Sequence, residues 1–156
     1  MYNVKCDVAI VGGGPAGLSA AIAAKEEGAQ KVLIIERDNA LGGILQQCIH
    51  PGFGLTRFNE ELTGTEYYGR FVDKANEVGV EYLLNSMVLQ VNDKTKEIIC
   101  ANAEYGLTKI TAKSSSSTAA LQVSTATSCL RWWSYPTAVF LPMLSKAARL
   151  MTCMFP

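Results

Sequence analysis

The sequence predicts an α/β fold built around a parallel sheet. Residues 8–11 and 32–35 are short apolar runs, which are typical of strands covered on both faces. Between them an alanine-rich stretch, residues 16–27, begins after Pro15 and ends at a glycine, as helices commonly do. Strand, helix and strand together have the length of one right-handed crossover, so we expect the two strands to be parallel neighbours.

The rest of the chain predicts a long loop, a helix and an extended region. Glycines and prolines interrupt any periodicity over residues 37–65, which indicates a functional loop. Residues 66–78 have the spacing of an amphipathic helix. Three extended stretches follow, at residues 80–84, 86–92 and 96–103. We expect them to form a small antiparallel element over residues 80–112.

Composition excludes several classes of function. Fourteen basic residues balance fourteen acidic ones, without a run of one sign that would attract nucleic acid. The five cysteines are widely spaced and form no pair of the kind that binds zinc, so we expect no metal site and a reducing, cytoplasmic setting. We read neither a secretory signal nor a membrane-spanning run.

A glycine motif lies between the first strand and the first helix. Gly12, Gly14 and Gly17 form Gly-x-Gly-x-x-Gly, in which the first permits the tight turn, the second lets a pyrophosphate approach and the third lets the helix pack closely. Pro15 and Ala16 open the helix, whose first-turn N–H groups lack intrahelical partners and favour an anion. The motif predicts a dinucleotide-binding turn.

Glu36 closes the second strand, nineteen residues after Gly17. A carboxylate at this place can accept hydrogen bonds from both hydroxyls of an adenosine ribose, and it would repel a 2′-phosphate. NADP is therefore disfavoured. The alternative, a glycine-rich turn that only packs well, does not explain the acidic residue.

A resemblance to a known family extends this interpretation. Residues 8–43, with Glu36-Arg37 and Leu41-Gly42-Gly43, resemble the FAD segment of the flavoproteins related to glutathione reductase. Residues 41–54 and 61–64 are similar to a narrower branch, the FAD/NAD(P)-binding oxidoreductases allied to anaerobic glycerol-3-phosphate dehydrogenase and the sarcosine oxidase alpha subunit.

The resemblance implies an FAD-dependent oxidoreductase with a Rossmann-like, three-layer FAD/NAD(P)-binding fold. In that family Gly42 and Gly43 would let the backbone run beside the flavin end of FAD, and Arg37 would belong to the cofactor site. The intact relative would also use NAD(P)H. Two alternatives stay open: an NAD-binding oxidoreductase, or a non-catalytic nucleotide-binding fragment that acts beside other oxidoreductase subunits.

Two residues of the loop are weak catalytic candidates. A thiol beside an imidazole can form a reactive thiolate, so Cys48 and His50 would matter if they share a side of the loop. We favour structural roles for both, because a single thiol cannot carry out dithiol exchange.

The resemblance covers residues 4 to about 113 and then stops. The family would continue there with a third buried strand and an NAD(P)-binding domain, whereas this chain has no second glycine motif. Codons for residues 115–120 can give nearly the missing strand when read one base out of phase. We therefore expect an incomplete FAD-binding domain at 1–113 and an aberrant, irregular tail at 114–156, the product of a frameshift, with an enzyme that is inactive as truncated.

Overall fold

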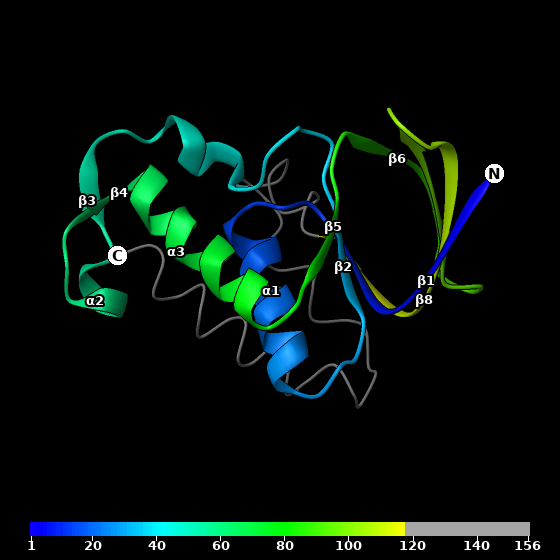
Figure 1. Ribbon diagram of the computed structural model, residues 1–156, viewed down its shortest axis with the longest axis horizontal. Coiled ribbons are helices and arrows are strands. Elements are labelled where there is room, and N and C mark those ends of the chain that lie inside the picture. The colour runs from blue at the N-terminus through cyan, green and yellow to red at the C-terminus, as the bar shows by residue number, and fades with distance from the viewer. Residues whose placement is uncertain (118–156) are drawn as a thin grey trace, which may run out of the picture.

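The computed structural model describes residues 1–117 of the chain, and our predictions for residues 118–156 lie outside this part. Figure 1 shows three layers: helices on one side, a group of parallel strands beside them, and an antiparallel meander on the other side. The strands of both layers belong to one six-stranded sheet in the order β5-β2-β1-β8-β7-β6. The predicted α/β fold with a parallel sheet and a small antiparallel element is confirmed.

The parallel layer centres on β1 (Tyr2–Val11) and β2 (Val32–Ile35). The two strands pair in parallel from Val8 opposite Val32 to Val11 opposite Ile35, as the crossover predicts. β5 (Glu81–Leu83) adds to the free side of β2, also in parallel. The expectation that the stretch after residue 80 belongs to the antiparallel element was therefore wrong for β5.

The meander consists of β6 (Ser86–Asn92), β7 (Glu97–Asn102) and β8 (Gly106–Ser117). β8 pairs antiparallel with β7 in its first half and parallel with β1 along nearly its whole length. Its ladder with β1 continues to Ser117, which lies opposite Val11. The strand thus passes the boundary that we predicted at residue 113, because ladder hydrogen bonds come from the backbone and a serine can continue them.

Two apolar cores separate the three layers. The first lies between the sheet and the helices α1 (Pro15–Glu26) and α3 (Gly64–Glu77). Its fully buried members include Ile10, Leu18, Ile22, Val32, Ile34 and Tyr67. The second lies between the parallel strands and the meander, and it includes Leu33, Ile35, Ile98, Cys100 and Ile110. A strand covered on both faces explains why β2 is an uninterrupted apolar run.

The predicted loop after β2 contains several short elements. They are η1 (Gly43–Gln47), β3 (Pro51–Phe53), α2 (Leu55–Phe58) and β4 (Leu62–Thr63). β3 and β4 pair antiparallel with each other, apart from the main sheet. Phe53 and Phe58 hold this segment against α3 through ring contacts with Tyr67. Elements this short have no periodicity that a sequence pattern could reveal.

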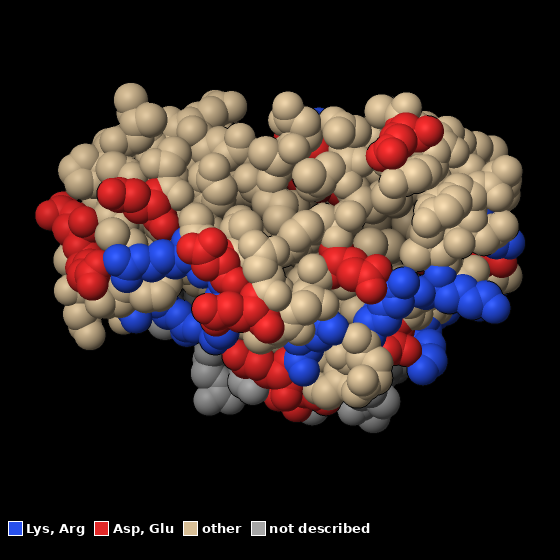
Figure 2. Space-filling model, viewed as in Figure 1, with Lys and Arg blue, Asp and Glu red and all other residues tan. Residues whose placement is uncertain are grey.

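The surface carries charges of both signs close together. Figure 2 shows acidic and basic side chains next to each other, mostly across the lower half of the view, while most of the upper half is uncharged. Within the part of the chain that the structure describes, no helix has the length and apolar character needed to cross a membrane.

Asp7 connects three segments at the point where β1 passes from one layer to the other. One carboxylate oxygen accepts a hydrogen bond from the Lys31 backbone N–H at 2.9 Å, and the other lies 2.7 Å from Lys113 Nζ on β8. The hydrogen bond from Lys113, and then that from the Lys31 backbone, hold the pKa of the Asp7 carboxyl below its ordinary value of 3.8. The ionised Asp7 carboxylate therefore stabilises the folded state more than the protonated carboxyl does.

We expect Asp7→Asn to destabilise the protein at neutral pH and to have a shrinking effect as the pH falls. A carboxyl with a lowered pKa in the folded state stabilises above its unfolded pKa and loses that contribution as the pH falls through the folded pKa. Urea unfolding at several pH values, with exposed Asp73→Asn as control, measures this difference. A destabilisation that stays constant down to about pH 2, below the range in which carboxyls titrate, would contradict the prediction.

Candidate cofactor site

The glycine motif forms the tight turn that the sequence predicts. Gly12 has φ 104°, in the left-handed region that favours glycine, and its N–H donates to Ile35 O at 2.8 Å. The turn therefore fastens the end of β1 to the end of β2. α1 begins at Pro15, after Gly14 as N-cap, and Gly17 is buried. The helix thus starts where the motif places it.

Gly13 is the residue of this turn that our sequence interpretation missed. Its N–H donates to Glu36 Oε2 at 2.5 Å, and its carbonyl accepts from the Gly42 N–H at 2.9 Å. A Cβ atom at this position would lie only 2.4 Å from Leu41 Cδ2. Gly13 occupies a variable position of the motif, so only the run of three glycines signals that a side chain does not fit.

Glu36 points toward the glycine turn, as the ribose-binding prediction requires. The residue is 8% exposed, and its two oxygens accept from different backbone groups: Oε2 from the Gly13 N–H, and Oε1 from the Asp38 N–H at 3.1 Å. A carboxylate can accept about four hydrogen bonds in all. These two backbone bonds therefore orient the group and leave acceptor capacity for a ligand.

The two long helices differ at their N-termini. At α3 the Thr63 side chain accepts from the Glu66 N–H, and Glu66 returns a bond to the Thr63 N–H, which is a capping box. α1 has no side-chain cap hydrogen bond and no acidic residue in its first turn. An anion at the start of α1 would meet the N–H groups that the capping box satisfies in α3.

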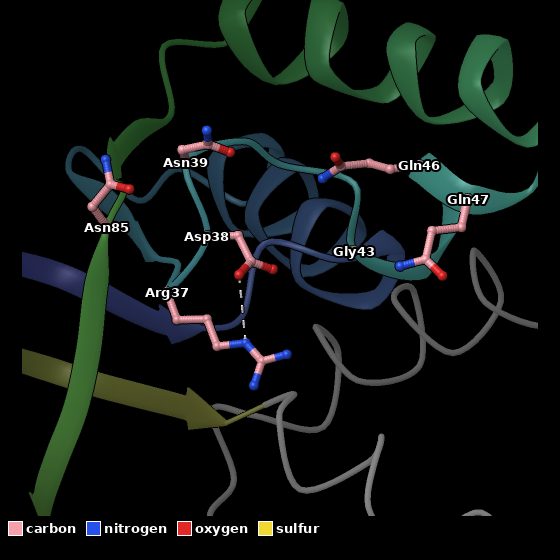
Figure 3. A pocket seen from close by; sticks show the side chains of 7 residues that line it. All are labelled: Arg37, Asp38, Asn39, Gly43, Gln46, Gln47 and Asn85. Atoms are coloured by element: carbon pink, nitrogen blue, oxygen red, sulfur yellow. Dashed lines mark ion pairs between the residues drawn. The ribbon is translucent and has the colours of Figure 1, made fainter.

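A pocket of about 540 Å³ opens beside the end of β2. It is lined by Arg37, Asp38, Asn39, Gly43, Gln46, Gln47 and Asn85. Figure 3 shows Asn39 and Asn85 at one end and the two glutamines of η1 at the other, with Arg37 and Asp38 pointing toward each other. Arg37 Nε lies 3.7 Å from Asp38 Oδ1, and both side chains are exposed. Such a lining offers donors and acceptors to a polar ligand.

The structure brings some predicted site residues into this pocket and leaves others beside it. Of the predicted residues, Arg37 and Gly43 line it. Gly42 instead is buried, has φ 113° and would bring a Cβ within 2.8 Å of the Tyr68 ring. Its N–H is already bonded to Gly13, so Gly42 ties the loop to the turn.

The sequence carries a signal for only some of the pocket residues that we did not predict. Asp38-Asn39 and Gln46-Gln47 are two polar pairs in the loop after the second strand, which is a weak signal. Asn85 has none, because it reaches the pocket from the bend between β5 and β6.

Cys48 and His50 form hydrogen bonds with separate backbone carbonyls. Cys48 Sγ donates to Ile44 O at 3.4 Å, and a Cβ on Gly64 would lie 2.5 Å from Cys48 Cβ, so the thiol packs against the start of α3. His50 Nδ1 lies 3.0 Å from Pro51 O, and its exposed ring stands 5.3 Å from that of Phe53. These contacts support structural roles. Within residues 1–117 no group of three or more metal-ligating side chains comes together.

A comparison with family models finds a match to part of the chain. Residues 7–77 match the model described as FAD dependent oxidoreductase, a segment that contains the glycine turn, Glu36 and most of the pocket. Over this segment, which is slightly less than half of the chain, the protein is similar to FAD-dependent oxidoreductases. This match supports FAD as the cofactor. The narrower branch named above stays a prediction.

Solved structures of oxidoreductases have a similar fold. L-proline dehydrogenase from P. horikoshii superposes with a TM-score of 0.61 at 27% identity, over 74% of this chain and 22% of that chain. A thioredoxin reductase from Gloeobacter violaceus gives 0.56 at 23% identity, over 72% and 36%. Polycyclic ketone monooxygenase from Thermothelomyces thermophila gives 0.58 at 15% identity, over 76% and 23%. The chain spans about a fifth to a third of these proteins. A search of curated proteins found no match.

Gly13→Ala should destabilise the fold, whereas Gly69→Ala should stabilise it slightly. The first substitution forces a methyl group into Leu41 and Glu36, while the second adds one to α3 where no atom lies within 4 Å. Overpacking typically costs about 1–3 kcal/mol, and alanine in a helix interior gains roughly 0.5–1 kcal/mol over glycine. Urea unfolding of both variants tests the pair. Equal stabilities would show that Gly13 is not confined.

Cys48 should react with iodoacetamide before Cys6 and Cys100 do. Burial raises the pKa of the Cys6 thiol to about 11, and it also raises the pKa of Cys100, so both thiols are scarce as thiolates. Cys48 is only half-buried. Brief labelling at about pH 8, near the ordinary thiol pKa, followed by peptide mapping measures the order. Denatured protein provides the control, because all three should then react alike.

Proposed function

We propose that the chain binds the ADP part of FAD through its glycine-rich βαβ unit, as the cofactor-binding portion of an oxidoreductase. The observation that carries this proposal is the buried Glu36 carboxylate, which accepts a hydrogen bond from the Gly13 N–H just before the N-terminus of α1. This N-terminus has no side-chain cap. The match over residues 7–77 favours FAD over NAD as the dinucleotide. The site residues are those predicted from the sequence: Gly12, Gly14, Pro15, Ala16, Gly17, Glu36, Arg37, Gly42 and Gly43.

Each part of the turn takes a different part of the ligand. The pyrophosphate approaches Gly14 and the first-turn N–H groups of α1, where the helix dipole favours negative charge. The ribose hydroxyls donate to Glu36, whose orientation is already set by two backbone bonds. A 2′-phosphate would place a second negative charge beside this carboxylate. Asn39 and Asn85, at one end of the pocket, then face the adenosine half.

When bound, FAD supplies a flavin that accepts a hydride or an electron pair. The residues of this chain bind and orient it, and they exclude NADP through Glu36. Gly43 lines the pocket just after the bonded Gly42, so the backbone of this segment is available to the flavin half. The substrate, the use of NAD(P)H and any partner subunit would depend on further contacts.

The purified chain should show the visible absorption of a flavin, released on denaturation. Stripped protein titrated separately with FAD, NAD and NADP should bind FAD most tightly and NADP least. Colourless protein whose melting temperature rises with NAD alone would favour the NAD-binding alternative. FAD binding without flavin reduction by nicotinamide donors or by oxidisable substrates would favour the non-catalytic fragment.

Glu36→Gln tests the residue that carries the proposal. The amide keeps the side-chain volume but removes the charge and one acceptor, so the dissociation constant for FAD should rise roughly 10- to 100-fold. Exposed Glu61→Gln is the matched control and should leave the constant unchanged. Equal affinities of the two variants for FAD would remove Glu36 from the site.

A further inference from the structure

The last residue of β7 reaches the bend that carries one wall of the pocket. Asn102 is 8% exposed, and its Nδ2 donates to Leu84 O at 3.0 Å and to Ser86 Oγ at 2.7 Å. Its Oδ1 accepts from the backbone N–H groups of Glu104 and Tyr105 at 2.8 and 2.7 Å. Because backbone N–H groups can only donate, these two bonds determine which end of the amide is oxygen.

The bend between β5 and β6 is bonded in turn to the end of β2. The Asn85 N–H donates to Asp38 O at 3.0 Å, and the Ser86 N–H donates to Glu36 O at 2.8 Å. Asn85 itself has φ 51°, an uncommon conformation for a residue with a side chain, and lines the pocket. The Asn85 carbonyl accepts from the Ala103 N–H at 3.1 Å. The bend is thus hydrogen-bonded to residues 102–103 on one side and to residues 36 and 38 on the other.

We propose that Asn102 is a positioning residue for the nucleotide pocket. It acts through the Leu84–Ser86 bend, which places the Asn85 side chain and the backbone of Glu36 and Asp38. This inference rests on the proposed function, since the pocket is taken to receive the adenosine half of FAD. Asn102 itself does not line the pocket.

Two further observations indicate that the Nδ2 group of Asn102 is needed to hold the bend in place. Ser86 is 1% exposed, and its Oγ donates to Leu84 O at 2.9 Å while it accepts from Asn102, so both of its hydrogen bonds lie within the bend and its contact with Asn102. Without the Asn102 Nδ2 group, Leu84 O would lose one of its two donors and Ser86 Oγ its only donor among the described residues. Buried acceptors that lose a partner favour rearrangement of the backbone that carries them.

Asn92 offers a matched control on the neighbouring turn. Its Oδ1 accepts from the N–H groups of Lys94 and Thr95 at 3.1 and 3.2 Å, in the same relative positions as for Asn102. Asn92 is exposed, and within the described residues its Nδ2 has no hydrogen-bond partner. The two asparagines therefore share the turn-forming role, and only Asn102 also holds the bend.

The experiment compares Asn102→Asp with Asn92→Asp. Aspartate keeps the oxygen that accepts from the turn and removes the donor. Asn102→Asp should therefore lower the affinity for FAD and the affinity for ADP by the same factor, about tenfold. Asn92→Asp should leave both affinities unchanged. Affinity is measured well below the unfolding temperature, where a loss of global stability alone would leave the dissociation constant of the folded protein unchanged. Equal affinities of the two variants would overturn the proposal.

Hydrogen exchange provides a readout that needs no ligand. The amides of Asn85 and Ser86 should exchange faster in Asn102→Asp than in Asn92→Asp, because their bonds to Asp38 and Glu36 loosen. Unchanged exchange would overturn the positioning role, whereas faster exchange in a chain that binds no FAD would support that role and overturn the proposed function alone. Should Asn102→Asp not fold, Ser86→Ala carries the test, since it removes one of the two acceptors and should give a smaller change in the same direction.

Discussion

The arrangement of the site depends on the peptide groups on either side of Gly13. The N–H of this residue bonds to the carboxylate that follows β2, and its carbonyl bonds to the N–H of Gly42 before η1. The glycine turn and two points of the segment that follows β2, Glu36 and Gly42, therefore meet at one buried glycine. Hydrogen bonds to a charged group are stronger than those between neutral groups, so the bond to Glu36 dominates this junction. A side chain at Gly13 would separate the segments.

Glu36 combines a structural and a binding role in one carboxylate. A buried charge is costly unless hydrogen bonds replace its hydration, and the N–H groups of Gly13 and Asp38 supply two of them. The remaining acceptor capacity is what a ribose would use. The glycine turn and the acidic residue are therefore one unit: the turn stabilises the charge, and the charge fixes the turn against the end of β2.

The sequence predicts the parts of the site that local patterns encode. The start of α1 at Pro15 and the orientation of Glu36 follow from strand, glycine and acid spacing, and the structure confirms both. The role of Gly13 could not be predicted, because it depends on Leu41 and Gly42 after β2. Asn85 enters the pocket from a bend far along the chain, and β8 continues through serines because β1 supplies its partners. These are tertiary effects without a local signal.

The meander influences the pocket because its connection to the parallel layer combines two kinds of contact. Apolar packing in the second core, as between Ile98, Ile110 and Leu33, holds the layers together but is non-directional, so it does not set the position of a single loop. The hydrogen bonds at residues 84–86 are directional and therefore determine where the bend lies. The bend is bonded to Glu36 and Asp38 on one side and to Asn102 on the other. The position of the pocket wall that Asn85 forms is consequently a property of the whole sheet, and a site built on the βαβ unit alone would lack it.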